Sequence, residues 1–152
     1  MTGGDVMMRN VGNNTPMPQF EATPWVTPKP LAEATVAIVT SAALHRPDDE
    51  GFVAGNDASY RTLDRTDRHL VLGHWSPNFD RSGFSMDLNV VYPIDRLEEL
   101  ADQGTIGRVA PRHFSFAGNQ PDDVATVRLD TGPQVAAQLN EDGVDIVVLT
   151  PV

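Results

Sequence analysis

Two runs of β-branched and aliphatic residues constrain the fold of this chain more than any other feature. Thr35–Thr40 (TVAIVT) and residues 144–150 (VDIVVLT) are nearly continuous apolar stretches rather than alternating ones. Such runs are typical of strands covered on both faces. Residues 133–140 carry a helical pattern just before the second run, and a helix followed by a buried strand is half of a βαβ unit. The sequence therefore predicts an α/β protein with part of a doubly wound, Rossmann-like parallel sheet in three layers.

Weaker patterns add further elements around these two strands. An apolar stripe predicts a helix over residues 93–103, and Gly104 follows it as a stop. In the helix at residues 133–140, the side chains expected to face inward are Val135, Ala136 and Leu139. Short strands are predicted at residues 70–73, 89–92 and 106–109. Residues 112–118 (RHFSFAG) fit either a polar loop or a short strand with Phe114 and Phe116 buried.

Proline divides the chain into two parts. Five of the 12 prolines lie in residues 1–33. Because proline fixes φ and removes a backbone donor, we expect residues 1–33 to form an extended arm, with Phe20 and Trp25 lying against the domain. Residues 34–152 then form the α/β domain. A buried-type strand followed only by Pro151 and Val152 lacks a covering helix, which fits either a domain that is incomplete at its carboxyl end or an edge strand at a natural carboxyl terminus.

The composition excludes several function classes. The net charge is −10, which disfavours binding to nucleic acid or to an anionic membrane surface. No cysteine is present, so these residues can form no disulfide, thiolate nucleophile or cysteine-based metal site. The longest apolar runs have about four residues, against the 18 or more of a spanning helix, and residues 1–10 contain no apolar signal region. We therefore expect a cytoplasmic protein without metal; a homo-oligomer stays open.

Polar residues that could do chemistry follow the predicted strands. His45 and His74 come directly after strand patterns, where active sites of parallel sheets form, and a histidine there can act as acid, base or hydrogen-bond donor. Residues 74–89 combine one histidine, carboxylates, amides and aromatic side chains, as a small-molecule pocket requires. The same residues could instead cap their own loop. No Gly-rich phosphate loop or Gly-x-Ser-x-Gly turn follows a strand.

Several blocks of sequence, taken in order, resemble one protein family. They are residues 24–34, Val36 to Thr40 with Leu44 and His45, and residues 74–80, 87–97, 104–107, 112–118 and 141–152. Together they are similar to the selenoprotein B family of glycine, sarcosine, betaine and D-proline reductases, in the branch of stand-alone bacterial homologues. The resemblance implies that the chain holds the N-terminal half of the family's fold.

The resemblance also implies a redox residue that this chain does not contain. After a strand like Leu149–Val152, members of the family place selenocysteine or cysteine, and a second cysteine shortly afterwards. Selenocysteine is encoded by UGA, which is ordinarily read as stop. The implied reaction is reductive cleavage of a C–N bond in an amino-acid derivative. A carrier selenoprotein or a thiol reductant would be the partner, and a pyruvoyl group could be present only in a partner subunit.

Site residues follow from the matching blocks. His74 is expected to be catalytic and to protonate the leaving amine. The residues expected to bind the small-molecule substrate are His45, Asp80, Asp87, Asn89, Arg96 and His113. Because the redox residue is absent, a redox-inactive binding module or fragment is the alternative function.

Overall fold

A mixed sheet organises the computed structural model, which describes residues 3–14, 26–76, 80–118, 120 and 124–152. Strand β1 (Thr35–Thr40) lies inside the sheet and pairs in parallel on both sides. One side carries β7 (Ile146–Thr150), in register from Val36 opposite Ile146 to Thr40 opposite Thr150. The other side carries β5 (Arg108–Val109) and β6 (Arg112–Phe116) in succession. β3 (Tyr60–Asp64) pairs antiparallel with β6.

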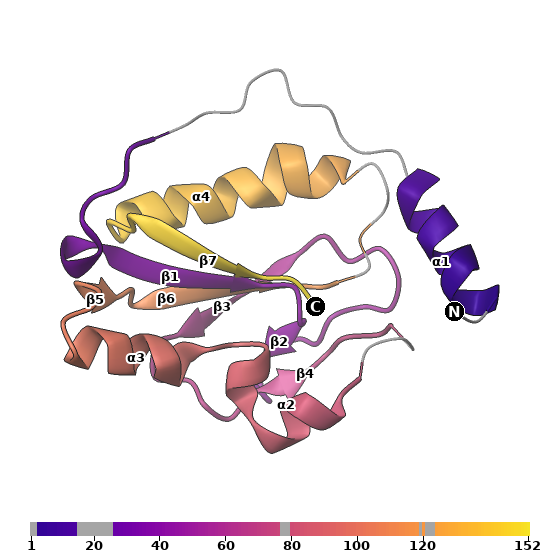
Figure 1. Cartoon of the computed structure of the whole chain (residues 1–152), viewed down its shortest axis with the longest axis horizontal. Coiled ribbons are helices and arrows are strands. Elements are labelled where there is room, and N and C mark those ends of the chain that lie inside the picture. Colours follow the sequence, from indigo (N-terminus) through magenta and orange to yellow (C-terminus); the bar gives the residue numbers. More distant parts are fainter. Residues whose placement is uncertain (1–2, 15–25, 77–79, 119, 121–123) are drawn as a thin grey trace.

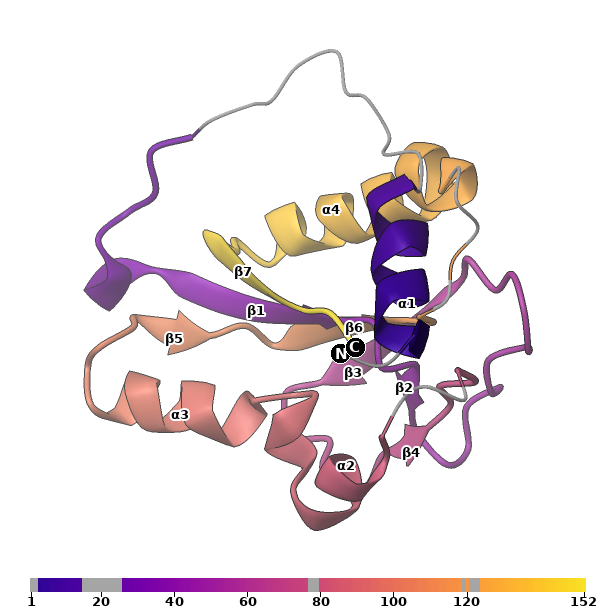
Figure 2. The same cartoon turned by 45° about the vertical axis from the view of Figure 1, so that its right-hand side comes forward.

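Helices lie on both sides of this sheet (Figure 1). α4 (Gly132–Glu141) covers one side, and α3 (Ile94–Asp102) with the short α2 (Ser82–Met86) lies on the other. A separate two-stranded antiparallel ribbon, β2 (Leu44–His45) with β4 (Val71–Leu72), lies near α2. Figure 1 shows α1 (Gly3–Asn14) beyond the end of the sheet where the carboxyl terminus lies, and in the turned view of Figure 2 α1 crosses in front of that end.

The main apolar core lies between the sheet and α3. Val36 and Ile38 of β1 pack with Ile94 and Leu97 of α3, all of them buried, and Tyr92 joins them just before the helix. Alternate residues of a strand point to one face, so the even-numbered residues of β1 supply this contact. Burial of such side chains contributes about 25 cal/mol per Å² of apolar surface.

Several predicted elements are confirmed. β1, α3 and β7 form where the apolar patterns place them, and α4 forms with Val135 buried. Gly104 follows α3 with a φ of +71°, the left-handed conformation that favours glycine after a helix. For residues 112–118 the strand alternative holds, because β6 forms and Phe114 is fully buried, although Phe116 is only half-buried.

Other predictions are wrong. The predicted strand at residues 89–92 is instead a 3₁₀ turn, Leu88–Val90, because the Asp87 side chain accepts from the Asn89 N–H and closes the turn. Ala136 is exposed on α4. The sheet is mixed rather than parallel throughout, because β3 runs antiparallel, and the expected doubly wound arrangement is not confirmed.

The predicted N-terminal arm differs from the structure in one stretch. Residues 26–30 are irregular, but Gly3–Asn14 forms α1, whose sequence contains no proline. Phe20 and Trp25 lie outside the described residues. Within the described part of the chain, no helix is long and apolar enough to cross a membrane.

Candidate functional site

Three parallel strands end together at one edge of the sheet. Because β1, β6 and β7 run in the same direction, their carboxyl ends meet there, the edge at which ligands bind in open α/β sheets. The Ser41 N–H donates to the Thr150 carbonyl at 3.2 Å and so extends the β1–β7 ladder by one residue. Two residues after β1, Ala42 forms an isolated antiparallel bridge with Ala117, the residue that follows β6. Figures 1 and 2 show the carboxyl terminus at this edge.

His74 reaches the same edge from β4. The N–H of the preceding Gly73 donates to the Ala43 carbonyl at 2.9 Å and fixes the approach of the chain. The His74 side chain is only 5% exposed. Its Nδ1 accepts from the Ser76 N–H at 3.2 Å, and the Val152 backbone lies close enough to the imidazole to influence its pKa. The structure therefore places the predicted catalytic histidine against the last described residue of the chain.

The surroundings of His74 favour its neutral form. Burial lowers the pKa of His74 below its ordinary value of 6.5, and the Arg81 charge lowers it further, while the Val152 backbone opposes both. The Arg81 Nη2 also donates to the His74 carbonyl at 2.5 Å, so this charge is held close. Because Nδ1 accepts a hydrogen bond, the neutral ring carries its proton on Nε2. His74 can thus present an N–H donor at this edge.

Hydroxyl groups hold the ends of the three strands. The Val152 N–H donates to Ser41 Oγ at 2.8 Å, and Thr150 Oγ1 donates to the Val91 carbonyl at 3.0 Å. Ser115 Oγ accepts from the Leu44 N–H at 2.6 Å, which ties β6 to β2. These residues were not predicted as site residues. Their position at or just after predicted strands is the only signal in the sequence that could have indicated them.

An apolar cavity of about 310 Å³ opens beside this edge. Its walls come from β1, β6, β7 and the turn before α4, and the apolar residues among them are Val39, Phe116, Ala117, Val127, Leu149 and Pro151. Thr40, Ser41, Gln120 and Thr150 supply polar atoms, and none of the described residues that line it carries a charge. The cavity suits an uncharged part of a ligand.

Two further predicted histidines lie elsewhere. His113 is fully buried, its Nδ1 accepts from the Ile38 N–H at 2.9 Å, and its ring stacks edge-on against Tyr92. Burial lowers the pKa of His113 to about 4. His45 is buried next to Phe52, with Nδ1 hydrogen-bonded to the Arg46 carbonyl at 2.8 Å.

The other predicted substrate-binding residues make local contacts. Asp80 accepts from the Ser82 N–H at 2.8 Å at the start of α2. Asp87 accepts from both the backbone and side-chain nitrogens of Asn89, which hold the pKa of Asp87 below its ordinary value. Arg96 pairs with Glu99 at 2.7 Å on the exposed face of α3. None of these contacts brings the residue to His74, so a role in binding stays a prediction for each.

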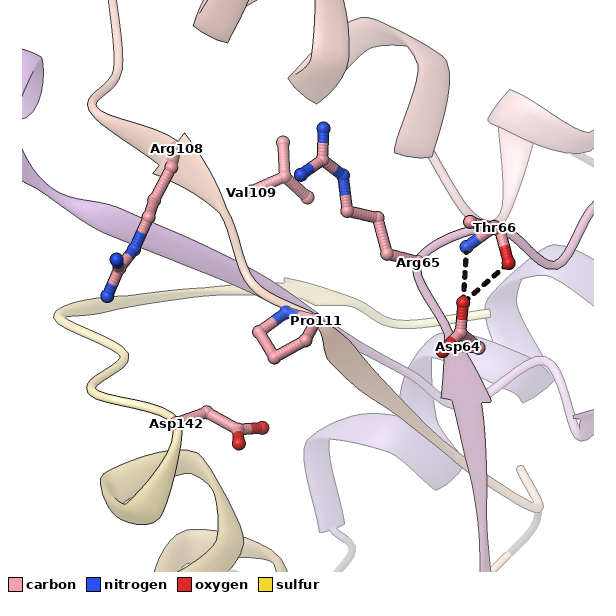
Figure 3. A pocket seen from close by; sticks show the side chains of 7 residues that line it. All are labelled: Asp64, Arg65, Thr66, Arg108, Val109, Pro111 and Asp142. Carbon is pink, nitrogen blue, oxygen red and sulfur yellow. Dashed lines mark hydrogen bonds between the residues drawn. The ribbon is translucent and has the colours of Figure 1, made fainter.

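A larger cavity, of about 520 Å³, lies at the opposite end of the parallel strands (Figure 3). Two of its charged groups form ion pairs: Arg65 makes two hydrogen bonds of 2.5 Å with Glu98, and Asp142 pairs with Arg112 at 2.8 Å. Arg108 donates to the Thr35 hydroxyl at 2.8 Å. Asp64 accepts from the Thr66 N–H at 2.8 Å, as Figure 3 shows. Among the described residues, no group of His, Asp and Glu is arranged to hold a metal ion.

Comparison with known proteins gives the family. The model of the family described as glycine/sarcosine/betaine reductase selenoprotein B matches residues 7–152. The chain belongs to this family. It is 36% identical over 124 residues to D-proline reductase subunit gamma of Acetoanaerobium sticklandii, an alignment that covers 80% of this chain and 50% of that one.

Two more relatives are subunits of multi-component reductases. Component B subunit gamma of the glycine reductase complex of Carboxydothermus hydrogenoformans is 28% identical over 152 residues, covering 93% of this chain and 33% of that one. Component B subunit beta of the betaine reductase complex of Peptoclostridium acidaminophilum is 26% identical over 141 residues, an alignment that covers 89% of this chain and 32% of that one. The chain thus spans a third to a half of the length of these relatives. No solved structure matches it.

Proposed function

We propose that this chain is the His74-bearing portion of a selenol- or thiol-dependent reductase that cleaves a C–N bond of an amino-acid-type substrate. The observation that carries the proposal is the position of His74 at the carboxyl edge of β1, β6 and β7, where its ring lies next to Gly118 and the Val152 N–H is held by Ser41. In a longer form of the chain, the residue after Val152 would lie next to this imidazole. We assign that position to selenocysteine or cysteine, with a second cysteine shortly after it.

In this proposal, the residue after Val152 carries out one part of the reaction, and the described residues carry out the other. A selenol or thiol attacks the carbon and displaces the amine. A second thiol then attacks the selenium or sulfur, so the carbon leaves with that bonding pair and takes a proton. The resulting selenosulfide or disulfide is reduced by a dithiol, which becomes a disulfide. The bonding pair of the broken C–N bond leaves on nitrogen, which then needs a proton. We assign this proton transfer to His74. The cavity formed by Val39, Phe116 and Leu149 would hold the uncharged part of the substrate.

The charge of His74 should depend on the residue that follows Val152. In this chain burial lowers the pKa of His74, so the ring is mostly neutral at pH 7. A selenolate or thiolate beside the ring would favour the imidazolium and raise that pKa, because an adjacent opposite charge stabilises the charged form. The proton donor is therefore assembled only when the nucleophile is present.

The family also supports proposals about partners and architecture. The relatives are components of reductase complexes, so we propose a carrier selenoprotein or thiol reductant as partner, with any pyruvoyl group in a partner subunit. Further strands beyond β7 would complete the doubly wound sheet. The absence of cysteine from the chain favours one alternative, a redox-inactive module that binds the small molecule without converting it.

Amine release with dithiothreitol as reductant tests the proposal. We expect none from the 152-residue chain and release from a longer form that carries selenocysteine or cysteine after Val152 together with the downstream cysteine. In the longer form, His74→Ala should lower turnover by about 10²–10⁴-fold, the usual contribution of a general acid. The matched control is His69→Ala, because His69 is exposed and belongs to no predicted site.

Two results would contradict the proposal. Amine release by the 152-residue chain would exclude a redox residue after Val152 as the nucleophile. Equal turnover of the longer form and its His74→Ala variant would leave His74 a packing residue.

A further inference from the structure

We propose that Ser41 and Gly118 are positioning residues that hold the Val152 backbone against the His74 imidazole. The proposal rests on the function proposed above, since it matters for catalysis only if the reacting residue follows Val152. The geometry itself belongs to the described chain. Four segments far apart in sequence meet here: the ends of β1, β6 and β7, and the residue pair after β4.

Ser41 sets the direction in which β7 leaves the sheet. Along β1 and β7 the pairing is made by backbone groups as far as the bond from the Ser41 N–H to the Thr150 carbonyl. At Val152 the pattern changes, because its N–H donates to the Ser41 side chain, at 2.8 Å. A side-chain acceptor thus replaces the next backbone acceptor. Removing this hydroxyl would free Val152 to continue straight from the strand.

Gly118 supplies the space that the His74 ring occupies. A Cβ built on Gly118 would lie 2.3 Å from His74 Nε2 and 3.1 Å from the Ser41 carbonyl oxygen. Any side chain there would push the imidazole away from its position or shift the end of β1. Gly118 follows Ala117, whose bridge to Ala42 fixes the backbone next to the ring.

The two residues therefore act on the same contact from opposite sides. Ser41 holds the Val152 backbone, and Gly118 leaves room for the ring that meets it. In the longer enzyme, a change at either position should affect turnover through the placement of the nucleophile relative to His74.

The test uses the 152-residue chain and requires no reaction. In Ser41→Ala, the Val152 amide should exchange its hydrogen about fivefold faster or more, as loss of one hydrogen bond predicts, and the nuclear Overhauser contact between the His74 ring and Val152 should weaken. Ser41→Thr keeps the hydroxyl and should restore both signals. In Gly118→Ala, the pKa of His74 should move up toward its ordinary value as the ring is displaced into water.

A matched glycine gives the control. At Gly51 a Cβ would meet His45 Nε2 at 3.7 Å, an ordinary contact, so Gly51→Ala should leave the histidine spectra unchanged. If Gly118→Ala weakens folding too far for spectra, the unfolding equilibrium is measured instead. The factor by which Gly118→Ala raises the unfolding equilibrium constant should then be about tenfold smaller or more in a His74→Ala background, because the ring that the new Cβ would meet has been removed.

Unchanged exchange and Overhauser signals in Ser41→Ala would overturn the role of Ser41. If Gly118→Ala raises the unfolding equilibrium constant by the same factor with and without the His74 ring, the role of Gly118 is overturned. Neither readout involves amine release, so failure of the proposed reaction and failure of the positioning role are distinguishable.

Discussion

The buried imidazole of His113 makes the stability of this protein depend on pH. Burial lowers the pKa of His113 to about 4, against an ordinary value of 6.5 in the unfolded chain. Protonation would place a charge in the core beside Tyr92 and would end the hydrogen bond that Nδ1 accepts from the Ile38 N–H. The native state therefore strongly disfavours the proton that the unfolded chain binds.

The sign and size follow from linkage. The contribution of His113 is fully present above pH 6.5, because the ring is neutral in both states, and it is lost as the pH falls from 6.5 toward 4. At about 1.4 kcal/mol per pKa unit, the whole loss is about 3 kcal/mol, of which about 2 kcal/mol falls between pH 7 and pH 5. Carboxylates with lowered pKa values, such as Asp64 and Asp95, add their losses only at lower pH.

Urea unfolding at several pH values, with His113→Asn as the comparison, measures this contribution. Asparagine can accept from the Ile38 N–H in place of Nδ1 but does not titrate. Between pH 7 and pH 5, the wild-type free energy of unfolding should fall by about 2 kcal/mol more than that of the variant. His74→Asn is the control for the other histidine whose pKa is lowered. Parallel pH profiles for wild type and His113→Asn would refute the reasoning.

Two further predictions concern the edge of the sheet and the start of α3. Leu149 is 70% exposed on β7, whose outer edge pairs with no other described strand. The 152-residue chain should therefore dimerise or aggregate, and Leu149→Lys should reduce this association. The control Leu129→Lys, at an exposed leucine of a helical turn, should not reduce it. Sedimentation checks it, and a monomeric wild-type chain at all concentrations would contradict it. Asn89 accepts from the Asp95 N–H at 3.0 Å and donates to Asp87 and Asp95, so Asn89→Ala should destabilise the fold by about 1 kcal/mol. An unchanged unfolding free energy, with a raised KM in the longer enzyme, would instead support the predicted role of Asn89 in substrate binding.

The sequence predicts the elements whose signals are local. The β-branched run of β1 and the amphipathic stripe of α3 follow from short-range periodicity, and both form as expected. β3 was not predicted, because its residues, YRTLD, are polar and only Leu63 is buried, and its place is set by antiparallel pairing with β6. The strand predicted at residues 89–92 failed because two polar side chains compete there with backbone pairing.

In the candidate site, too, residues with a local sequence signal could be predicted and residues positioned by long-range contacts could not. A histidine after a strand predicts a place at the carboxyl edge, and His74 lies there. Ser41 and Gly118 could not be predicted, because their contacts join residues more than 40 positions apart and depend on the register of three strands. His113 also carried a family-based prediction, yet its burial within β6 is a property of the packed sheet rather than of its neighbours in sequence.

The codon that follows the one for Val152 tests the central claim most directly. If this edge of the sheet presents a redox residue to His74, that codon is UGA, or encodes cysteine, and a cysteine codon follows in frame within a few positions, ahead of a helical pattern. Sequencing the gene beyond Val152 provides the answer. A UAA or UAG codon with no continuing frame would contradict the account.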